Sequence, residues 1–274
     1  MPKRIWTPSC WGPHTKLNPA SLVKKGVSWT ASQIPIFTRV FFWRIYPDAM
    51  AKRLAKLVLG LALIPFCVGF TWQLGAAVFS VAYKPGAPYY FVGGGLAYLA
   101  LHLLFKKPIF TYVIGHELTH ALFAMLFGGS VKSLQASNRG GRVTVTKSNF
   151  VITLAPYFFP LYTFVALLFY EAALAADAGA AVTNAVIFFS GAAFTFHLVL
   201  TFIFLQTDQS DIREQGALFS YPLIYLFNIA FTAVLIDVYL AINMDYLRFF
   251  AGGIIKTADL ITLLMKKAYA LVPK

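Results

Sequence analysis

The sequence predicts an all-α polytopic membrane protein with about six transmembrane helices and a small β-hairpin. Of its 274 residues, 59% are hydrophobic and only 12% are charged, whereas a soluble domain carries about a quarter charged residues. The mean hydropathy is +0.69. Several segments stay apolar over roughly the 20 residues that a helix needs to cross the hydrocarbon core of a bilayer.

The predicted spans lie near residues 55–80, 89–105, 109–128, 150–170, 180–206 and 217–242. Lys106, Lys107 and Pro108 separate the second span from the third and predict a tight polar turn. In the fourth span, Pro156 and Pro160 each remove a helical hydrogen bond, so we expect this span to kink or break. Membrane helices tolerate such breaks where neighbours or water satisfy the freed backbone groups. The break either opens a path for water or substrate or is a plain structural kink.

The spans are flanked by two basic regions. We expect a basic, aromatic and partly interfacial N-terminal region over residues 1–54, a transmembrane domain over 55–242 and an amphipathic tail over 243–274. The net charge is +13, and Lys and Arg gather near both ends of the chain. Because they flank apolar spans, the expected partner is anionic lipid and not nucleic acid. Cys10 lies in the basic region and Cys67 in a span, so no disulfide is expected.

A β-hairpin is predicted between the third and fourth spans. Residues 131–147 alternate in side-chain character around the turn Ser137-Asn138-Arg139-Gly140-Gly141, a pattern typical of two short antiparallel strands. The hairpin is either a surface loop or an edge that holds an unwound substrate segment by backbone pairing.

His116, Glu117 and His120 form a His-Glu-x-x-His pattern inside the third span. Ionisable side chains at membrane depth are costly and mark functional sites. On a helix, residues i and i+4 share a face, so both imidazoles can bind one ion with Glu117 beside them. The pattern is typical of a zinc site in which the glutamate is the general base. The other interpretation is a histidine pair packed between helices and satisfied by hydrogen bonds.

A catalytic zinc ion takes three protein ligands and leaves one position for water. Two carboxylates between the fifth and sixth spans are candidates for the third ligand: we prefer Asp211, with Asp208 as the alternative. Asp211 also precedes the apolar sixth span and could instead cap its N-terminus. His197, in the middle of the fifth span, is a candidate for contact with a zinc ligand, although a lone buried histidine is more often a hydrogen-bonded core residue.

These features resemble the site-2 protease family of intramembrane zinc metalloproteases. The resemblance rests on the intramembrane His116-Glu117-x-x-His120, on the Gly-Gly pair and hairpin that follow it, and on an aspartate two spans later. It covers roughly residues 109–230 and implies three core helices around a zinc ion. His116 and His120 would be zinc ligands and Glu117 the catalytic base. The implied substrates are segments of membrane proteins, cut in or near the membrane.

The resemblance therefore predicts a zinc-dependent intramembrane endopeptidase in a multi-pass protein of the cell (inner) membrane, with residues 55–242 as the metalloprotease-like domain. The family usually supplies its third ligand from a Leu-Asp-Gly unit, whereas this chain has Gln-Thr-Asp-Gln-Ser-Asp-Ile. The alternative is a catalytically inactive zinc-binding scaffold of the same fold. The orientation of the protein in the membrane is also open. With six spans, the positive-inside rule puts the N-terminus in the cytoplasm and the hairpin outside, whereas the family's hairpin faces the cytoplasm. Either the number of spans differs from six by one, or the topology differs from that of the family.

Overall fold

The structure is a computed structural model that describes residues 47–81, 86–240 and 244–271. Most of the expected interfacial region, residues 1–46, lies outside the described residues. The elements in chain order are α2 (Pro47–Val81), α3 (Ala87–Leu104), α4 (Ile109–Leu126), β1 (Val131–Ser137), β2 (Gly140–Val145), α5 (Phe150–Phe158), α6 (Leu161–Ala175), α7 (Gly179–Leu205), α8 (Ser210–Gln215), α9 (Ala217–Leu240) and α10 (Tyr246–Ala270).

The predicted fold class is confirmed: the chain is a helical polytopic membrane protein, and its described residues include a two-stranded sheet. Among the described residues, four helices are long and apolar enough to cross a membrane, and a bent pair, α5 with α6, makes five. The remaining expected span, near residues 89–105, corresponds to α3, which is not among them. Its 18 residues include a proline, three tyrosines, three glycines and a histidine, and these lower its hydropathy.

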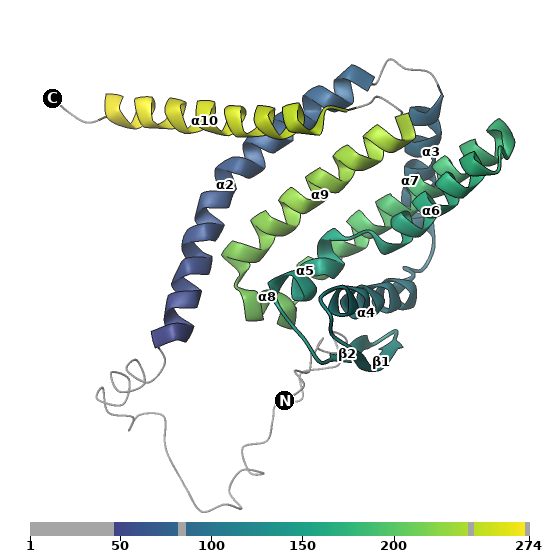
Figure 1. The fold of residues 1–274 in the computed structure, drawn as a ribbon, viewed down its shortest axis with the longest axis horizontal. Coiled ribbons are helices and arrows are strands. Elements are labelled where there is room, and N and C mark those ends of the chain that lie inside the picture. Colours follow the sequence, from purple (N-terminus) through teal and green to yellow (C-terminus); the bar gives the residue numbers. More distant parts are fainter. Residues whose placement is uncertain (1–46, 82–85, 241–243, 272–274) are drawn as a thin grey trace, which may run out of the picture.

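The long helices pair in two groups. α2 runs beside α9, and α6 runs beside α7, which also packs on α3 (Figure 1). At the α3–α7 crossing, Gly94 faces the carbonyl oxygen of Phe188 and Gly191 faces that of Phe91, where any side chain would clash. Small residues at such crossings let membrane helices approach closely and gain packing energy.

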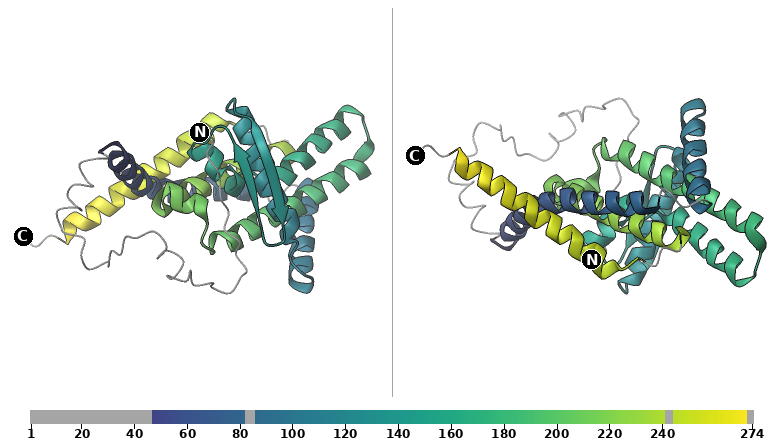
Figure 2. Two further views of the ribbon diagram at one scale, coloured as in Figure 1. Left: turned by 90° about the horizontal axis from the view of Figure 1, so that it is seen from below. Right: turned by 90° about the horizontal axis from the view of Figure 1, so that it is seen from above.

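The C-terminal helix α10 lies across α2 near the end of that helix (Figures 1 and 2). It buries Phe249, Gly253 and Thr257, which recur every four residues and so share one face. Gly253 packs on the ring of Phe70, and Phe249 meets the same ring edge-on at 6.1 Å between centroids. The predicted tail is therefore a helix with one packed stripe, while its exact boundary at residue 243 remains a prediction.

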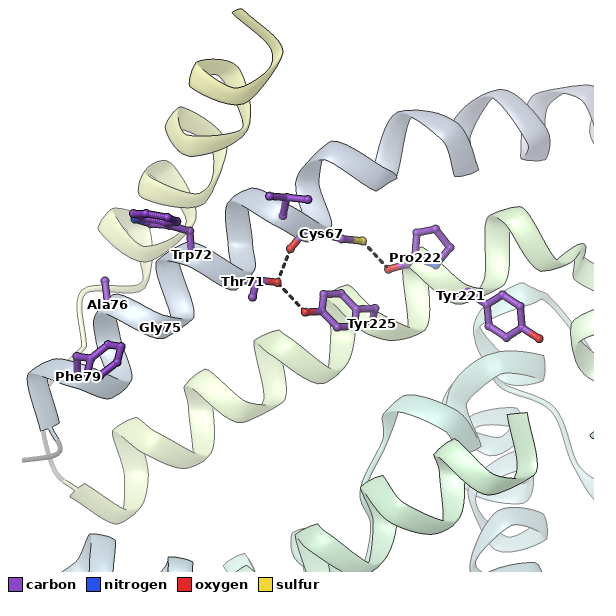
Figure 3. Close-up of a pocket in the computed structure, with 10 residues that line it drawn as sticks. Cys67, Thr71, Trp72, Gly75, Ala76, Phe79, Tyr221, Pro222 and Tyr225 are labelled. Carbon is purple, nitrogen blue, oxygen red and sulfur yellow. Dashed lines mark hydrogen bonds between the residues drawn. The ribbon is translucent and has the colours of Figure 1, made fainter. Parts of the chain in front are cut away.

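The contact between α2 and α9 depends on a proline and a glycine. Pro222 has no N–H group, so the carbonyl of Leu218, four residues earlier, lacks its helical donor. Gly60 of α2 lies against this same carbonyl, where a side chain would clash. Further along, Thr71 and Tyr225 join the two helices by a hydroxyl–hydroxyl hydrogen bond of 2.6 Å (Figure 3). This bond lies in an apolar groove of about 890 Å³ between the helices.

The hairpin forms as predicted, with β1 antiparallel to β2. Gly128 ends α4 with a φ of +71°, and its N–H donates to the carbonyl of Met125 at 2.8 Å. This left-handed conformation favours glycine and turns the chain into β1. Val143 and Val145 of β2 are fully buried against Ala124 of α4, so the hairpin is fixed to the helix that carries the histidines.

The fourth span breaks, as its prolines predict: α5 and α6 are bent by 70°. Asn149 starts α5 by accepting a hydrogen bond from the N–H of Ile152 at 2.9 Å, and Pro160 directly precedes α6. The break lets α5 pack against α4, α8 and α9 while α6 pairs with α7. The short helix α5 thus enters the centre of the molecule, where the histidines lie.

Candidate metal centre

Helix α4 presents His116 and His120 on one buried face, one helical turn apart. Their rings meet edge-on with centroids 4.8 Å apart. His120 is fully buried, and Glu117, next to His116 in sequence, is only 1% exposed. Three ionisable side chains are therefore held in the protein interior, where each needs a charged or hydrogen-bonding partner.

Asp211 joins the two histidines from the first turn of α8. Its Oδ2 lies 3.5 Å from Nε2 of His116 and 3.5 Å from Nε2 of His120. Two donor atoms bound about 2.1 Å from one tetrahedral zinc ion lie about 3.4 Å apart, so the spacing fits shared coordination. Charge-assisted hydrogen bonds would be shorter, at about 2.7–2.9 Å. The geometry fits a cation between the three side chains.

The electrostatics of Asp211 suit a cation as well. Burial raises the pKa of a carboxyl group, but the imidazoles of His116 and His120 outweigh this effect and keep the pKa of Asp211 below its usual value. The side chain therefore stays a carboxylate although it is only 1% exposed. A buried negative charge of this kind calls for a positive partner.

His120 is oriented by a backbone group. Its Nδ1 lies 2.8 Å from the carbonyl oxygen of Ile152 in α5. A carbonyl only accepts, so Nδ1 carries a proton and donates, and Nε2 is the nitrogen that a metal would bind. A carbonyl or carboxylate in this position is the usual support for a histidine that binds a metal.

Tyr157 of α5 supports Asp211, and the sequence analysis did not identify it. Its hydroxyl donates to Oδ2 of Asp211 at 3.0 Å and lies 3.3 Å from Oε1 of Gln209. Asn228 of α9 fixes Tyr157 in turn, because its Nδ2 donates to the Tyr157 carbonyl at 3.0 Å. The sequence did offer one indication of its role, because Tyr157 lies between Pro156 and Pro160 in the span that follows the histidines and the hairpin.

Glu117 lies against the hairpin. A Cβ added to Gly141 of β2 would lie 2.5 Å from Cγ of Glu117 and 2.6 Å from its Oε1. The absence of a side chain at residue 141 therefore lets the strand backbone reach the glutamate. This contact joins Glu117, the predicted base on α4, to the β-hairpin that follows α4.

Of the other two predicted site residues, Asp208 lies away from the histidine pair, whereas His197 lies close to His116. Asp208, the alternative third ligand, is exposed and pairs with Arg213 at 2.7 Å. Its position gives it no contact with the histidines, so Asp211 is the aspartate that the structure brings to them. His197 of α7 is 6% exposed and has His116 among its polar neighbours.

Residues 94–207 match the family model described as Peptidase M50B-like. This match supports membership of the site-2 protease (M50) family. The matched segment contains His116, Glu117, His120 and the hairpin, and it ends four residues before Asp211. A search of curated proteins and a search of solved structures each found no match.

The family match and the apolar helices together support an integral membrane protein with a peptidase-like segment over residues 94–207. Site-2 proteases are typically zinc-dependent, and the group of His116, His120 and Asp211 offers a nitrogen, nitrogen and oxygen donor set that suits zinc. Asp211 lies outside the matched segment, so its assignment depends on the geometry alone.

Proposed function

We propose that this protein is a zinc-dependent intramembrane endopeptidase. The observation that carries the proposal is the convergence of His116, His120 and Asp211, whose ligand atoms all lie within 4.8 Å of one another. Glu117 follows His116 on α4 and is buried as the two histidines are. Three ligands plus an adjacent carboxylate are the parts that a hydrolytic zinc site requires.

The chain's own residues have separable tasks in peptide hydrolysis. Zinc bound at this site would polarise a peptide carbonyl and acidify water. Glu117 is the base that removes a proton from the attacking water, and it then returns this proton to the leaving amine. His120, oriented by the Ile152 carbonyl, and Asp211, oriented by Tyr157, keep their donor atoms directed at one point. Gly141 holds the strand backbone against Glu117 and limits its movement.

The proposed substrates are segments of membrane proteins. A helical substrate hides its peptide bonds, so it must unwind before water can attack. The hairpin offers backbone groups for pairing with an extended chain, and it lies next to the proposed base. We also propose the cell (inner) membrane as the location, with anionic lipid at the basic termini.

The test combines metal analysis with cleavage. We expect purified wild type to contain about one zinc per chain, and Asp211→Ala to lose it while Asp208→Ala keeps it. Glu117→Gln should keep zinc but lose cleavage of fluorogenic peptides derived from transmembrane segments, assayed in detergent micelles. Unchanged cleavage by Glu117→Gln, or zinc retained by Asp211→Ala, would contradict the proposal.

The second candidate is a catalytically inactive zinc-binding scaffold that holds transmembrane partners. The observation that favours it is the Gln-Ser-Asp-Ile sequence around Asp211, where the family usually has Leu-Asp-Gly. The same experiment separates the two candidates. A wild type that binds zinc through Asp211 and turns over none of the peptides supports the scaffold.

A further inference from the structure

Two of the three proposed zinc ligands have a visible support, and the third does not. His120 donates to the carbonyl of Ile152, and Asp211 accepts from Tyr157. In His116, Nε2 faces Asp211, whereas Nδ1 is buried and has no hydrogen-bond partner among the described residues. A histidine that binds a metal almost always donates its other ring N–H, so Nδ1 needs an acceptor.

A small cavity lies next to this unsupported ligand. It has a volume of about 20 Å³ and is lined by both His116 and His197, as well as by aromatic side chains. One water molecule needs about 10–15 Å³ and two to four polar partners, so the volume suits a single water. The walls come from α4, α5, α6 and α7 and from the break between α5 and α6, so the cavity lies where these helices meet.

Most polar side chains in the cavity wall are already paired elsewhere. The hydroxyl of Tyr112 bonds to Thr201, that of Thr119 to the carbonyl of Gly115, and that of Tyr162 to a backbone carbonyl of α4. The remaining polar wall side chains are the two histidines. Nε2 of His197 is buried and, like Nδ1 of His116, has no hydrogen-bond partner in the described part of the chain.

We propose that one buried water molecule bridges Nδ1 of His116 and Nε2 of His197. His116 donates its Nδ1 proton to the water oxygen, and the water donates one of its protons to the lone pair on Nε2 of His197. The bridge fixes the tautomer of His116 that leaves Nε2 free for the metal. His197 is thus a positioning residue that acts on the zinc site through His116. This inference rests on the proposed function, because it assumes that His116 binds zinc.

Asn228 anchors this arrangement from α9. Its side chain is among the polar neighbours of His197, and its Nδ2 also donates to the backbone of Tyr157. Through this one residue, the supports of His116 and of Asp211 are attached to the same helix. A displacement of α9 would therefore loosen two of the three ligands together.

The test measures zinc affinity in detergent by competition with a chromogenic chelator. We expect His197→Leu, which removes the acceptor, to weaken zinc binding by about 10- to 100-fold, the usual loss when the support of a metal ligand is removed. His197→Gln keeps a polar group near the water and should retain most of the affinity. Ser190→Ala, two turns earlier on the same buried stripe of α7, is the control and should bind zinc as wild type does.

Two further readouts separate positioning from folding. Zinc-free wild type and zinc-free His197→Leu should unfold at similar temperatures, and the visible absorption of the cobalt-substituted site should shift in His197→Leu but not in Ser190→Ala. Wild-type zinc affinity and spectrum in His197→Leu would overturn the inference while leaving the proposed function intact. A wild type that binds no zinc would instead overturn the proposed function.

A structure of zinc-loaded wild type that resolves water molecules gives a second measurement, which does not depend on any variant folding. We expect one water within hydrogen-bond distance of both His116 Nδ1 and His197 Nε2. A cavity without such a water, or a direct contact between the two rings, would overturn the bridge.

Discussion

Replacing Gly141 by alanine tests whether the hairpin holds the proposed catalytic base. The new Cβ would lie 2.5 Å from Cγ of Glu117, whereas ordinary van der Waals contact begins near 3.4 Å. Either the strand or the glutamate must therefore move by about 0.9 Å. The strand is fixed by Val143 and Val145, both fully buried, so we expect much of the movement to fall on Glu117.

A displacement of this size has a predictable effect on catalysis. A misplacement of about 1 Å can cost on the order of 100-fold in rate, so we expect Gly141→Ala to lower kcat/KM for the fluorogenic transmembrane peptides by about that factor. Zinc content should not change, because Glu117 is not one of the three ligand residues. Gly93→Ala is the matched control, since its Cβ would meet the nearest atom, on Phe188, at an ordinary 3.7 Å.

The result that refutes this reasoning is wild-type kcat/KM in Gly141→Ala. It would mean that the strand moves freely, or that the contact with Glu117 has no role in proton transfer. Loss of zinc together with activity would also contradict the argument, because it would place the effect of the substitution on the ligands and not on the base.

The remaining predictions concern the support of Asp211 and the topology. Tyr157→Phe removes the 3.0 Å hydrogen bond to Asp211 and should weaken zinc binding by about 10- to 100-fold in the chelator titration; unchanged affinity would show that Asp211 needs no such support. Single cysteines at Met50 and Ser137, in a cysteine-free background, should react with a membrane-impermeant thiol reagent from the same side of the membrane. A cysteine at Asp177, in the turn between α6 and α7, should react from the opposite side (Figure 1).

The sequence predicted those features whose cause is local. Hydropathy placed most of the spans, alternation placed the hairpin, and Pro156 and Pro160 placed the break at the right point of the fourth span. The His-Glu-x-x-His pattern similarly determined which side chains share a helix face. Each of these depends on neighbours within a few residues, which a sequence displays directly.

The features that the sequence missed depend on contacts between distant residues. Tyr157 lies 54 residues from Asp211, and no local pattern indicates that their side chains meet. Asp208 and Asp211 lie in one polar segment, so the sequence alone cannot show which of them is the third zinc ligand. The short helix α8, which was not predicted, turns Asp211 inward and leaves Asp208 in solvent with Arg213.

The structure also removes the conflict between charge and family layout. Six crossings would place the hairpin across the membrane from the first turn of α2, but Figure 1 shows both at the lower end of the molecule, with the ends of α2 and α9 at the upper end. The expected second and third spans are α3 and α4, and together they return the chain once from the upper end to the hairpin. If Lys52, Arg53 and Lys56 at the start of α2 lie in the cytoplasm, as the positive-inside rule favours, the hairpin faces the cytoplasm too. The layout usual in site-2 proteases and the charge distribution of this chain then require the same orientation.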